Sequence, residues 1–135
     1  MPNDAEPDLG SLSYLIVEDE EFSRAVIRKN LEKIGASKIT TASNGIEALA
    51  QLQSPEPPPD VIFIDIIMPE MGGVELLRHL GDGGFKGAVA LVSAAGEETL
   101  AVAEGMAKYR DLNVLGFITK PVTPQSLTEI LGKLG

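Results

Sequence analysis

The chain has 135 residues, of which 44% are hydrophobic and 23% are charged, so it is long enough for one domain with a substantial core. Its net charge of −9 argues against nucleic-acid binding by the chain itself, because there is no basic stripe to neutralise phosphates. The absence of cysteine excludes disulfides and thiolate chemistry, and since no membrane span or signal peptide is evident we expect a cytoplasmic protein without a membrane partner.

Five β-prone runs, most of them apolar, alternate with five segments of helical apolar spacing along the chain. The first ten residues are acidic and contain two prolines, so we expect a mobile tail over residues 1–10 and one domain over residues 11–135. The β-prone runs predict strands, at 12–17, 38–42, 61–64, 87–92 and 114–119. The segments that follow them predict helices, at 22–34, 44–52, 74–81, 97–110 and 124–134. This alternation is typical of right-handed βαβ units, and it predicts an α/β fold with a doubly wound parallel sheet covered on both faces.

Polar and glycine signals mark several helix ends. Gly35 is expected to end the first helix, and Asn44 with Glu47 three residues later is a capping arrangement. Thr123 followed by Pro124 is typical of a helix N-terminus.

Asp65 is the residue on which the predicted site depends. It follows the apolar run of the third strand, where an unpaired buried carboxylate would be costly. A strand-end position costs less, because a parallel sheet opens to solvent and ligands at its carboxyl edge. Pro69 and the pair Gly72 and Gly73 then turn the chain sharply toward the next helix. We therefore expect Asp65 to face a crevice at the mouth of the sheet.

Acidic residues also end the first strand. If the first and third strands are neighbours, Glu18 and Asp19 lie close to Asp65. Two carboxylates ~5 Å apart repel by roughly 3 kcal/mol at an effective dielectric near 20, and a cation between them relieves that repulsion. Carboxylates without His or Cys favour Mg²⁺, Mn²⁺ or Ca²⁺, and a site with room for water and a phosphate fits Mg²⁺ best.

Ser93 and Lys120 follow the fourth and fifth strands and therefore emerge at the same edge of the sheet. A divalent cation, an ammonium group, a hydroxyl and backbone N–H groups together form a receptor for a dianionic phosphoryl group. Asp65 then lies where it can act as a nucleophile and form an acyl phosphate.

Four motifs resemble those of the receiver domains of two-component response regulators, including chemotaxis regulators. They lie at residues 15–20, 63–73, 91–94 and 117–121, in the order and close to the spacing of that family. The resemblance covers roughly residues 12–134. It implies a flavodoxin-like fold with strand order 2-1-3-4-5, in which the first and third strands are neighbours.

The resemblance implies a role for each matched residue at the phosphoryl site. Asp65 matches the phosphoacceptor, and Lys120 matches the lysine that pairs with the phosphoryl group. Ser93 matches the hydroxyl residue that bonds a phosphoryl oxygen, and Ala94 matches the small residue that leaves space for it.

The resemblance also implies a Mg²⁺ site. Asp19 and Asp65 match the carboxylates that bind the metal, and the backbone carbonyl of Ile67 matches the third protein ligand. Glu18 matches the acidic neighbour in the second coordination shell.

The implied function is phosphate-based signal transduction. A histidine kinase or phosphotransfer protein would supply the phosphoryl group to Asp65, and the chain would catalyse only this transfer and a slow autodephosphorylation. Ser93 would then move toward the phosphoryl group, and Phe117, which matches the aromatic switch position, would rotate inward. The partner-binding face implied for this switch consists of the fourth and fifth helices and the strand between them. In that family the peptide bond before Pro121 is usually cis.

Two features depart from the commonest family pattern. The segment between Ser93 and Lys120 is about five residues longer than in compact receivers, which resembles receivers joined to cyclic-dinucleotide phosphodiesterase domains. Ile67 is aliphatic where a polar side chain often approaches the phosphoryl site, and with the small Ala95 it suggests a less assisted attacking water.

Several alternatives remain open from the sequence. A haloacid-dehalogenase-type phosphatase would need an acid at position 67, where this chain has isoleucine. A flavin-binding protein would need a phosphate-binding loop after the first strand, and none follows it. The chain is otherwise a receiver that binds a separate partner, a receiver fragment of a larger regulator, or a receiver-like scaffold that is not phosphorylated.

Overall fold

The computed structural model describes residues 8–54, 56–68, 70–94 and 96–134. Strands and helices alternate along this part of the chain after a short 3-10 turn, η1 (Leu9–Ser11). The strands are β1 (Ser13–Val17), β2 (Lys38–Ala42), β3 (Val61–Asp65), β4 (Ala88–Ser93) and β5 (Asn113–Thr119). The helices are α1 (Glu21–Lys33), α2 (Gly45–Leu52), α3 (Gly73–Asp82), α4 (Glu97–Tyr109) and α5 (Pro124–Leu131).

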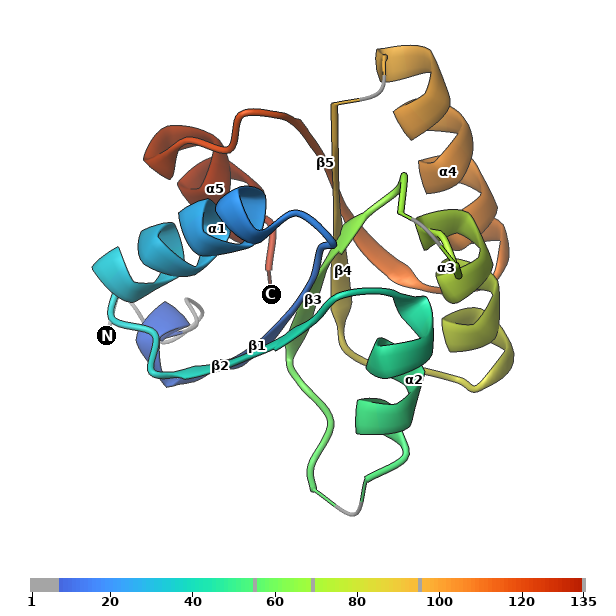
Figure 1. The fold of residues 1–135 in the computed structure, drawn as a ribbon, viewed down its shortest axis with the longest axis horizontal. Helices are drawn as coiled ribbons and strands as arrows, with labels where there is room; N and C mark the ends of the chain where they lie inside the picture. Colours follow the sequence, from blue (N-terminus) through green and yellow to red (C-terminus); the bar gives the residue numbers. More distant parts are fainter. Residues whose placement is uncertain (1–7, 55, 69, 95, 135) are drawn as a thin grey trace.

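The strands form one parallel sheet in the order β2-β1-β3-β4-β5. This confirms the predicted doubly wound α/β fold and the strand order that the resemblance implied. In Figure 1, α1 and α5 cover one face of the sheet and α2, α3 and α4 cover the other. Every strand therefore ends at the same edge, where the loops to the helices begin.

Each face of the sheet packs its own apolar core. Successive residues of a strand point to opposite faces, so Tyr14 and Ile16 join the core beneath α1 and α5. Leu15 and Val17 join the core beneath the other three helices. In β3 all five residues are buried, which is why its sequence reads as an apolar run without alternation.

The helix ends follow the predicted caps, with one difference. The side chain of Asn44 accepts a hydrogen bond from the Glu47 N–H at 2.8 Å, and Gly35 has the positive φ of 95° that favours glycine after a helix. The last helix ends at Leu131 instead of reaching residue 134, because the chain leaves the helix at Gly132. Leu134 still packs against the core, so the apolar spacing continued past the end of the helix.

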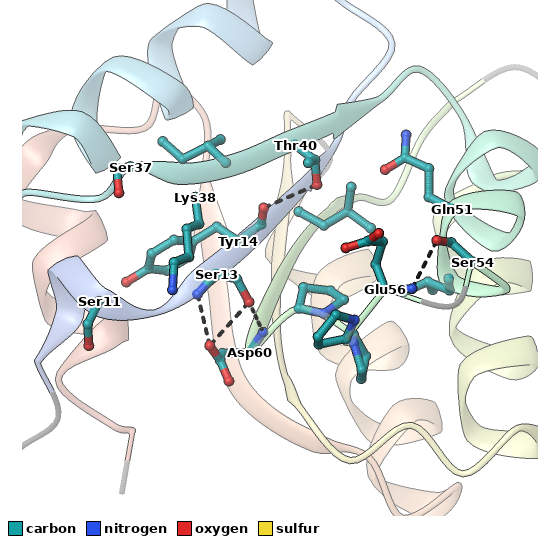
Figure 2. Close-up of a pocket in the computed structure, with 16 residues that line it drawn as sticks. Ser11, Ser13, Tyr14, Ser37, Lys38, Thr40, Gln51, Ser54, Glu56 and Asp60 are labelled. Atoms are coloured by element: carbon teal, nitrogen blue, oxygen red, sulfur yellow. Dashed lines mark hydrogen bonds between the residues drawn. The ribbon is translucent and has the colours of Figure 1, made fainter.

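A groove of about 820 Å³ lies where the strands begin, at the end of the sheet away from Asp65. Its wall includes the proline connection between α2 and β3, whose residues Glu56, Pro57 and Pro58 are exposed. Figure 2 shows Asp60 fixing the end of this connection, since its carboxylate accepts hydrogen bonds from the N–H and the hydroxyl of Ser13 at 2.8 and 3.2 Å. No carboxylate of the predicted metal site lines this groove.

The predicted tail lies mostly outside the described residues, which begin at Asp8. The carbonyl of Leu9 in η1 accepts a hydrogen bond from the Tyr14 hydroxyl at 2.7 Å. Burial, followed by the negative charges of Asp60 and Asp8, raises the pKa of Tyr14 to about 12. Among the helices of the described segments, none is long and apolar enough to cross a membrane.

Candidate functional site

Strand register brings the predicted site residues together at the carboxyl edge of the sheet. Val17 pairs with Ile64 across β1 and β3, so the next residues, Glu18 and Asp65, are neighbours. The Glu18 N–H also donates to the Ala42 carbonyl at 3.0 Å, which extends β1 beyond its last residue. The two acids therefore lie side by side for reasons of backbone pairing alone.

Lys120 reaches this acidic pair from the far side of β4. The backbone N–H of Lys120 donates to the Ser93 carbonyl at 2.9 Å. The peptide bond from Lys120 to Pro121 is cis, as the resemblance implied. The ammonium nitrogen lies 2.8 Å from Glu18 Oε1 and 3.3 Å from Asp65 Oδ2. The contact with Glu18 is an ion pair between a buried carboxylate and a largely buried ammonium. One cation thus partly balances two buried carboxylates.

The third acid, Asp19, completes a cluster that fits a divalent cation. One carboxylate oxygen each from Glu18, Asp19 and Asp65 lies within 4.8 Å of the other two. Glu18 and Asp65 are buried, so their charges are poorly solvated and Lys120 offsets only part of them. An all-oxygen donor set of this kind suits Mg²⁺, Mn²⁺ or Ca²⁺. The residues present therefore fit the predicted metal.

The pKa values of Glu18 and Lys120 reflect this crowding. Burial raises the pKa of Glu18 from 4.5 to about 7, although the Lys120 ammonium and the Glu20 N–H act in the opposite direction. Burial lowers the pKa of Lys120, but pairing with Glu18 and the negative charge of Asp65 outweigh that effect and raise it. The cluster consequently holds its lysine charged and resists ionisation of Glu18.

Mg²⁺ affinity is expected to rise by about tenfold between pH 6 and pH 8, because the proton on Glu18 competes with the metal through a pKa of about 7. Amide chemical shifts recorded during a Mg²⁺ titration at each pH measure the affinity.

The raised pKa of Glu18 also affects the stability of the metal-free fold. Glu18 contributes stability at low pH, and this contribution is lost as pH rises through about 7.

Glu18→Gln should abolish the pH dependence of the Mg²⁺ affinity, since glutamine does not ionise. His79→Gln is the control, because His79, on α3, is the only histidine of the chain. Equal affinities at the two pH values would contradict the assignment to Glu18, as would a dependence removed by the His79 substitution.

The other predicted residues lie at or just beyond the ends of β3 and β4, except Phe117, which lies within β5. Ser93 ends β4 and is buried, while Ala94 beside it is exposed. The side chain of Ile67 is 62% exposed, and its N–H donates to Asp65 Oδ1 at 3.3 Å. Phe117 is half-buried against the core beneath α4. Pro69 and Ala95 lie outside the described residues.

Two side chains outside the predicted set of site residues also contact the cluster. Glu20 Oε1 lies 3.5 Å from the Lys120 ammonium, so a third carboxylate shares the lysine. The guanidinium of Arg24 in α1 donates to the backbone carbonyls of Glu18 and Asp19 at 2.8 and 3.4 Å. Arg24 acts on the residues that follow β1 from the first turns of α1, whereas Glu20 acts on Lys120 from the position just before that helix. The only signal for Arg24 in the sequence was its position shortly after the acids.

The loop that follows Asp65 is held by the N-terminus of α2. The Gly45 N–H donates to the Met71 carbonyl at 3.1 Å, and the Asn44 amide donates to Glu70 at 2.7 Å. A Cβ at Gly45 would lie 2.6 Å from Cγ of Met71, so the two residues are in close contact. This contact fixes the loop from outside the acidic cluster.

The fold and the acid–lysine cluster define a flavodoxin-like α/β domain with an acidic site at the carboxyl edge of its sheet. The family model of the response regulator receiver domain matches residues 14–132, and the chain belongs to this family. It is a receiver domain of the kind found in CheY-like response regulators.

Known relatives agree with this assignment. The chemotaxis protein CheY of Thermotoga maritima is 30% identical over 120 residues, which cover 89% of this chain and 94% of the relative. The protein-glutamate methylesterase/protein-glutamine glutaminase 5 of Myxococcus xanthus is 35% identical over 127 residues, but these cover 34% of that relative. The crystal structure of a response regulator from Colwellia psychrerythraea superposes with a TM-score of 0.74 at 29% identity, covering 90% of this chain and 94% of that one.

Proposed function

We propose that this chain is a phosphoacceptor of two-component signalling, in which Asp65 receives a phosphoryl group and the fold converts that event into a change of surface. The observation that carries the proposal is the position of the Lys120 ammonium, 3.3 Å from Asp65 Oδ2 and 2.8 Å from Glu18 Oε1 inside a cluster of three acids. A lysine buried among acids at the mouth of a sheet is suited to receive further negative charge there.

In the proposed reaction, a carboxylate oxygen of Asp65 attacks the phosphorus of a phosphohistidine donor. The new P–O bond forms as the P–N bond breaks, and the imidazole leaves with the electron pair of that bond. Lys120 lies close enough to Asp65 to pair with an oxygen of the transferred group. The Ser93 hydroxyl, at the end of the neighbouring strand, would donate to a second oxygen.

Asp19, Asp65 and the Ile67 carbonyl would hold Mg²⁺, with Glu18 beside them. When bound, the metal would supply positive charge against the oxygens of the group in transfer. The proposed reaction requires this metal because of charge: a dianionic phosphoryl group approaching three carboxylates and one ammonium meets net repulsion.

The proposed output is a rearrangement of the face formed by α4, β5 and α5. Ser93 and Thr119 pair across β4 and β5, so a movement of Ser93 toward the phosphoryl group is transmitted to the strand that carries Phe117. The half-buried Phe117 side chain would then turn further inward. A downstream protein or an attached output domain would recognise the altered face. The M. xanthus relative is long enough to carry such a domain, because the match covers only 34% of its length. We propose that the chain works in the cytoplasm and has no enzymatic activity toward a separate substrate.

Incubation with Mg²⁺ and acetyl phosphate is expected to add the mass of one phosphoryl group to the intact protein. Because the chain contains no tryptophan, amide NMR with Mg²⁺ and beryllofluoride is the suitable spectroscopic measurement. We expect shifts at residues 18–20 and 65–67 and also along β5 and α5. If there is no mass gain and no beryllofluoride response, the chain is a receiver-like scaffold that is not phosphorylated. Turnover of acetyl phosphate without a covalent adduct would indicate a phosphatase.

A further inference from the structure

Arg24 joins the first turns of α1 to the two acidic residues that precede the helix. One guanidinium nitrogen, Nη1, donates to the Glu18 carbonyl at 2.8 Å and lies 3.4 Å from the Asp19 carbonyl. The side chain is half-buried, so these contacts form in partly excluded solvent and are stronger than they would be in water. The backbone N–H of Arg24 donates to the Glu20 carbonyl at 2.9 Å, which anchors the residue in the helix.

With these contacts the backbone of Glu18 is held from both sides. Its N–H is bound to the Ala42 carbonyl of β2 at 3.0 Å, and its carbonyl is bound to Arg24. The side chain is held separately, because Glu18 Oε2 accepts from the Glu20 N–H at 3.0 Å. The backbone carbonyl of Asp19 accepts one hydrogen bond among those described for this turn, and Arg24 donates it. The backbone that carries the Asp19 carboxylate is therefore held in part by Arg24.

We propose that Arg24 is a positioning residue for the divalent cation. It strengthens cation binding by fixing the backbone that carries two of the three clustered acids, Glu18 and Asp19. This proposal rests on the proposed function in that it takes Mg²⁺ as the cation. Groups that orient metal ligands without touching the metal typically change its affinity by about 10- to 100-fold when removed. Arg24 differs from most of them because it orients the ligands through their main chain.

A purely electrostatic role for Arg24 predicts the opposite result. The guanidinium is a positive charge near the acids, so its removal would strengthen the attraction of the cluster for another cation. A positioning role predicts weaker binding, because the carboxylates lose their fixed direction. The sign of the change in Mg²⁺ affinity therefore distinguishes the two roles.

The test compares three variants of the full chain by Mg²⁺ titration with amide NMR detection. Arg24→Met removes the hydrogen bonds and the charge but keeps an unbranched stem, and Arg24→Gln keeps a polar end that is too short to reach both carbonyls. Arg28→Met is the matched control, because Arg28 lies one turn later in α1, carries the same charge and, within the described part of the chain, pairs only with the exposed Glu32. We expect a Mg²⁺ affinity about tenfold weaker for both Arg24 variants and unchanged for the control.

Two further measurements separate positioning from a general loss of structure. The carbonyl carbon shifts of Glu18 and Asp19 should change in the metal-free Arg24 variants and not in the control. The rate of phosphorylation by acetyl phosphate should require about tenfold more Mg²⁺ for half-saturation and should recover at saturating Mg²⁺. A variant that was only destabilised would lose rate at every Mg²⁺ concentration.

An unchanged or tighter affinity in the Arg24 variants overturns the proposal, as does an equal loss in Arg28→Met. Should Arg24→Met fail to fold, Arg24→Gln gives the decision by the same criteria. If the unmodified protein binds no Mg²⁺, the proposed function itself fails. That result is distinct from normal binding that persists when Arg24 is replaced.

Discussion

Asp65→Asn is expected to lose all phosphoryl uptake from acetyl phosphate while keeping the fold. The amide that replaces the carboxylate is not a nucleophile toward phosphorus, and it removes one of the three acids of the cluster. Because the shape of the side chain is preserved, the buried position at the end of β3 still fits. Intact-protein mass spectrometry after incubation with Mg²⁺ should show no added phosphoryl group, against one in the unmodified chain.

Asp111→Asn is the matched control for this prediction. Asp111 is exposed, and its φ of 64° is a conformation that asparagine tolerates well, so the same chemical change there should alter neither fold nor uptake. A phosphoryl group recovered on Asp65→Asn would show that another residue is the acceptor. Loss of uptake in the Asp111 variant would show that the assay reports something other than the site.

Gly73→Ala is expected to be among the most destabilising single changes in the protein. A Cβ at position 73 would lie 2.6 Å from the Asp65 carbonyl oxygen and 2.6 Å from Cα of Ile66, and both neighbours are backbone atoms that cannot turn away. We expect a loss of about 3 kcal/mol in the free energy of unfolding, typical of overpacking in a dense region. The midpoint of thermal unfolding should fall by roughly 10 °C. Because the backbone that must shift carries Asp65, phosphorylation of the folded fraction should slow as well.

Gly105→Ala separates this steric effect from the general effect of alanine in a helix. Gly105 lies within α4, and a Cβ there would meet nothing within 4 Å. Alanine should therefore stabilise the protein by about 0.5–1 kcal/mol through its better helix propensity. Equal effects of the two substitutions on the unfolding midpoint would contradict the close approach of α3 to the end of β3.

The architecture could be predicted from the sequence because its signals are local and repeated. Most strands are apolar runs of five to seven residues buried between helices, and the edge strand β2 is marked by its β-branched residues. The helices are marked by apolar residues at helical spacing. The order of the strands was less accessible, since backbone pairing between distant segments leaves no local pattern. The crowding of acids after two strands, Glu18 and Asp65, and the family resemblance supplied that information.

The composition of the site was predictable, and its supporting contacts were not. Acids, a serine and a lysine at strand ends are visible in the sequence, because a parallel sheet collects strand ends at one edge. The contacts of Arg24 with main-chain carbonyls leave no such mark, since any helix may carry an arginine in its first turns. The contact of Met71 with Gly45 is likewise hidden, because it depends on how closely the loop after β3 approaches the N-terminus of α2.

The proline connection between α2 and β3 is a suitable place to attach a label or a tether. Its exposed residues Glu56 to Pro58 lie at the end where the strands begin, and Asp60 ties the connection to Ser13. Exposed loop tips tolerate insertions and attachments well. A fluorescent label or a surface tether placed there leaves the acidic cluster at the opposite end of the sheet accessible, so the proposed binding of metal ions can be tested on an immobilised sample.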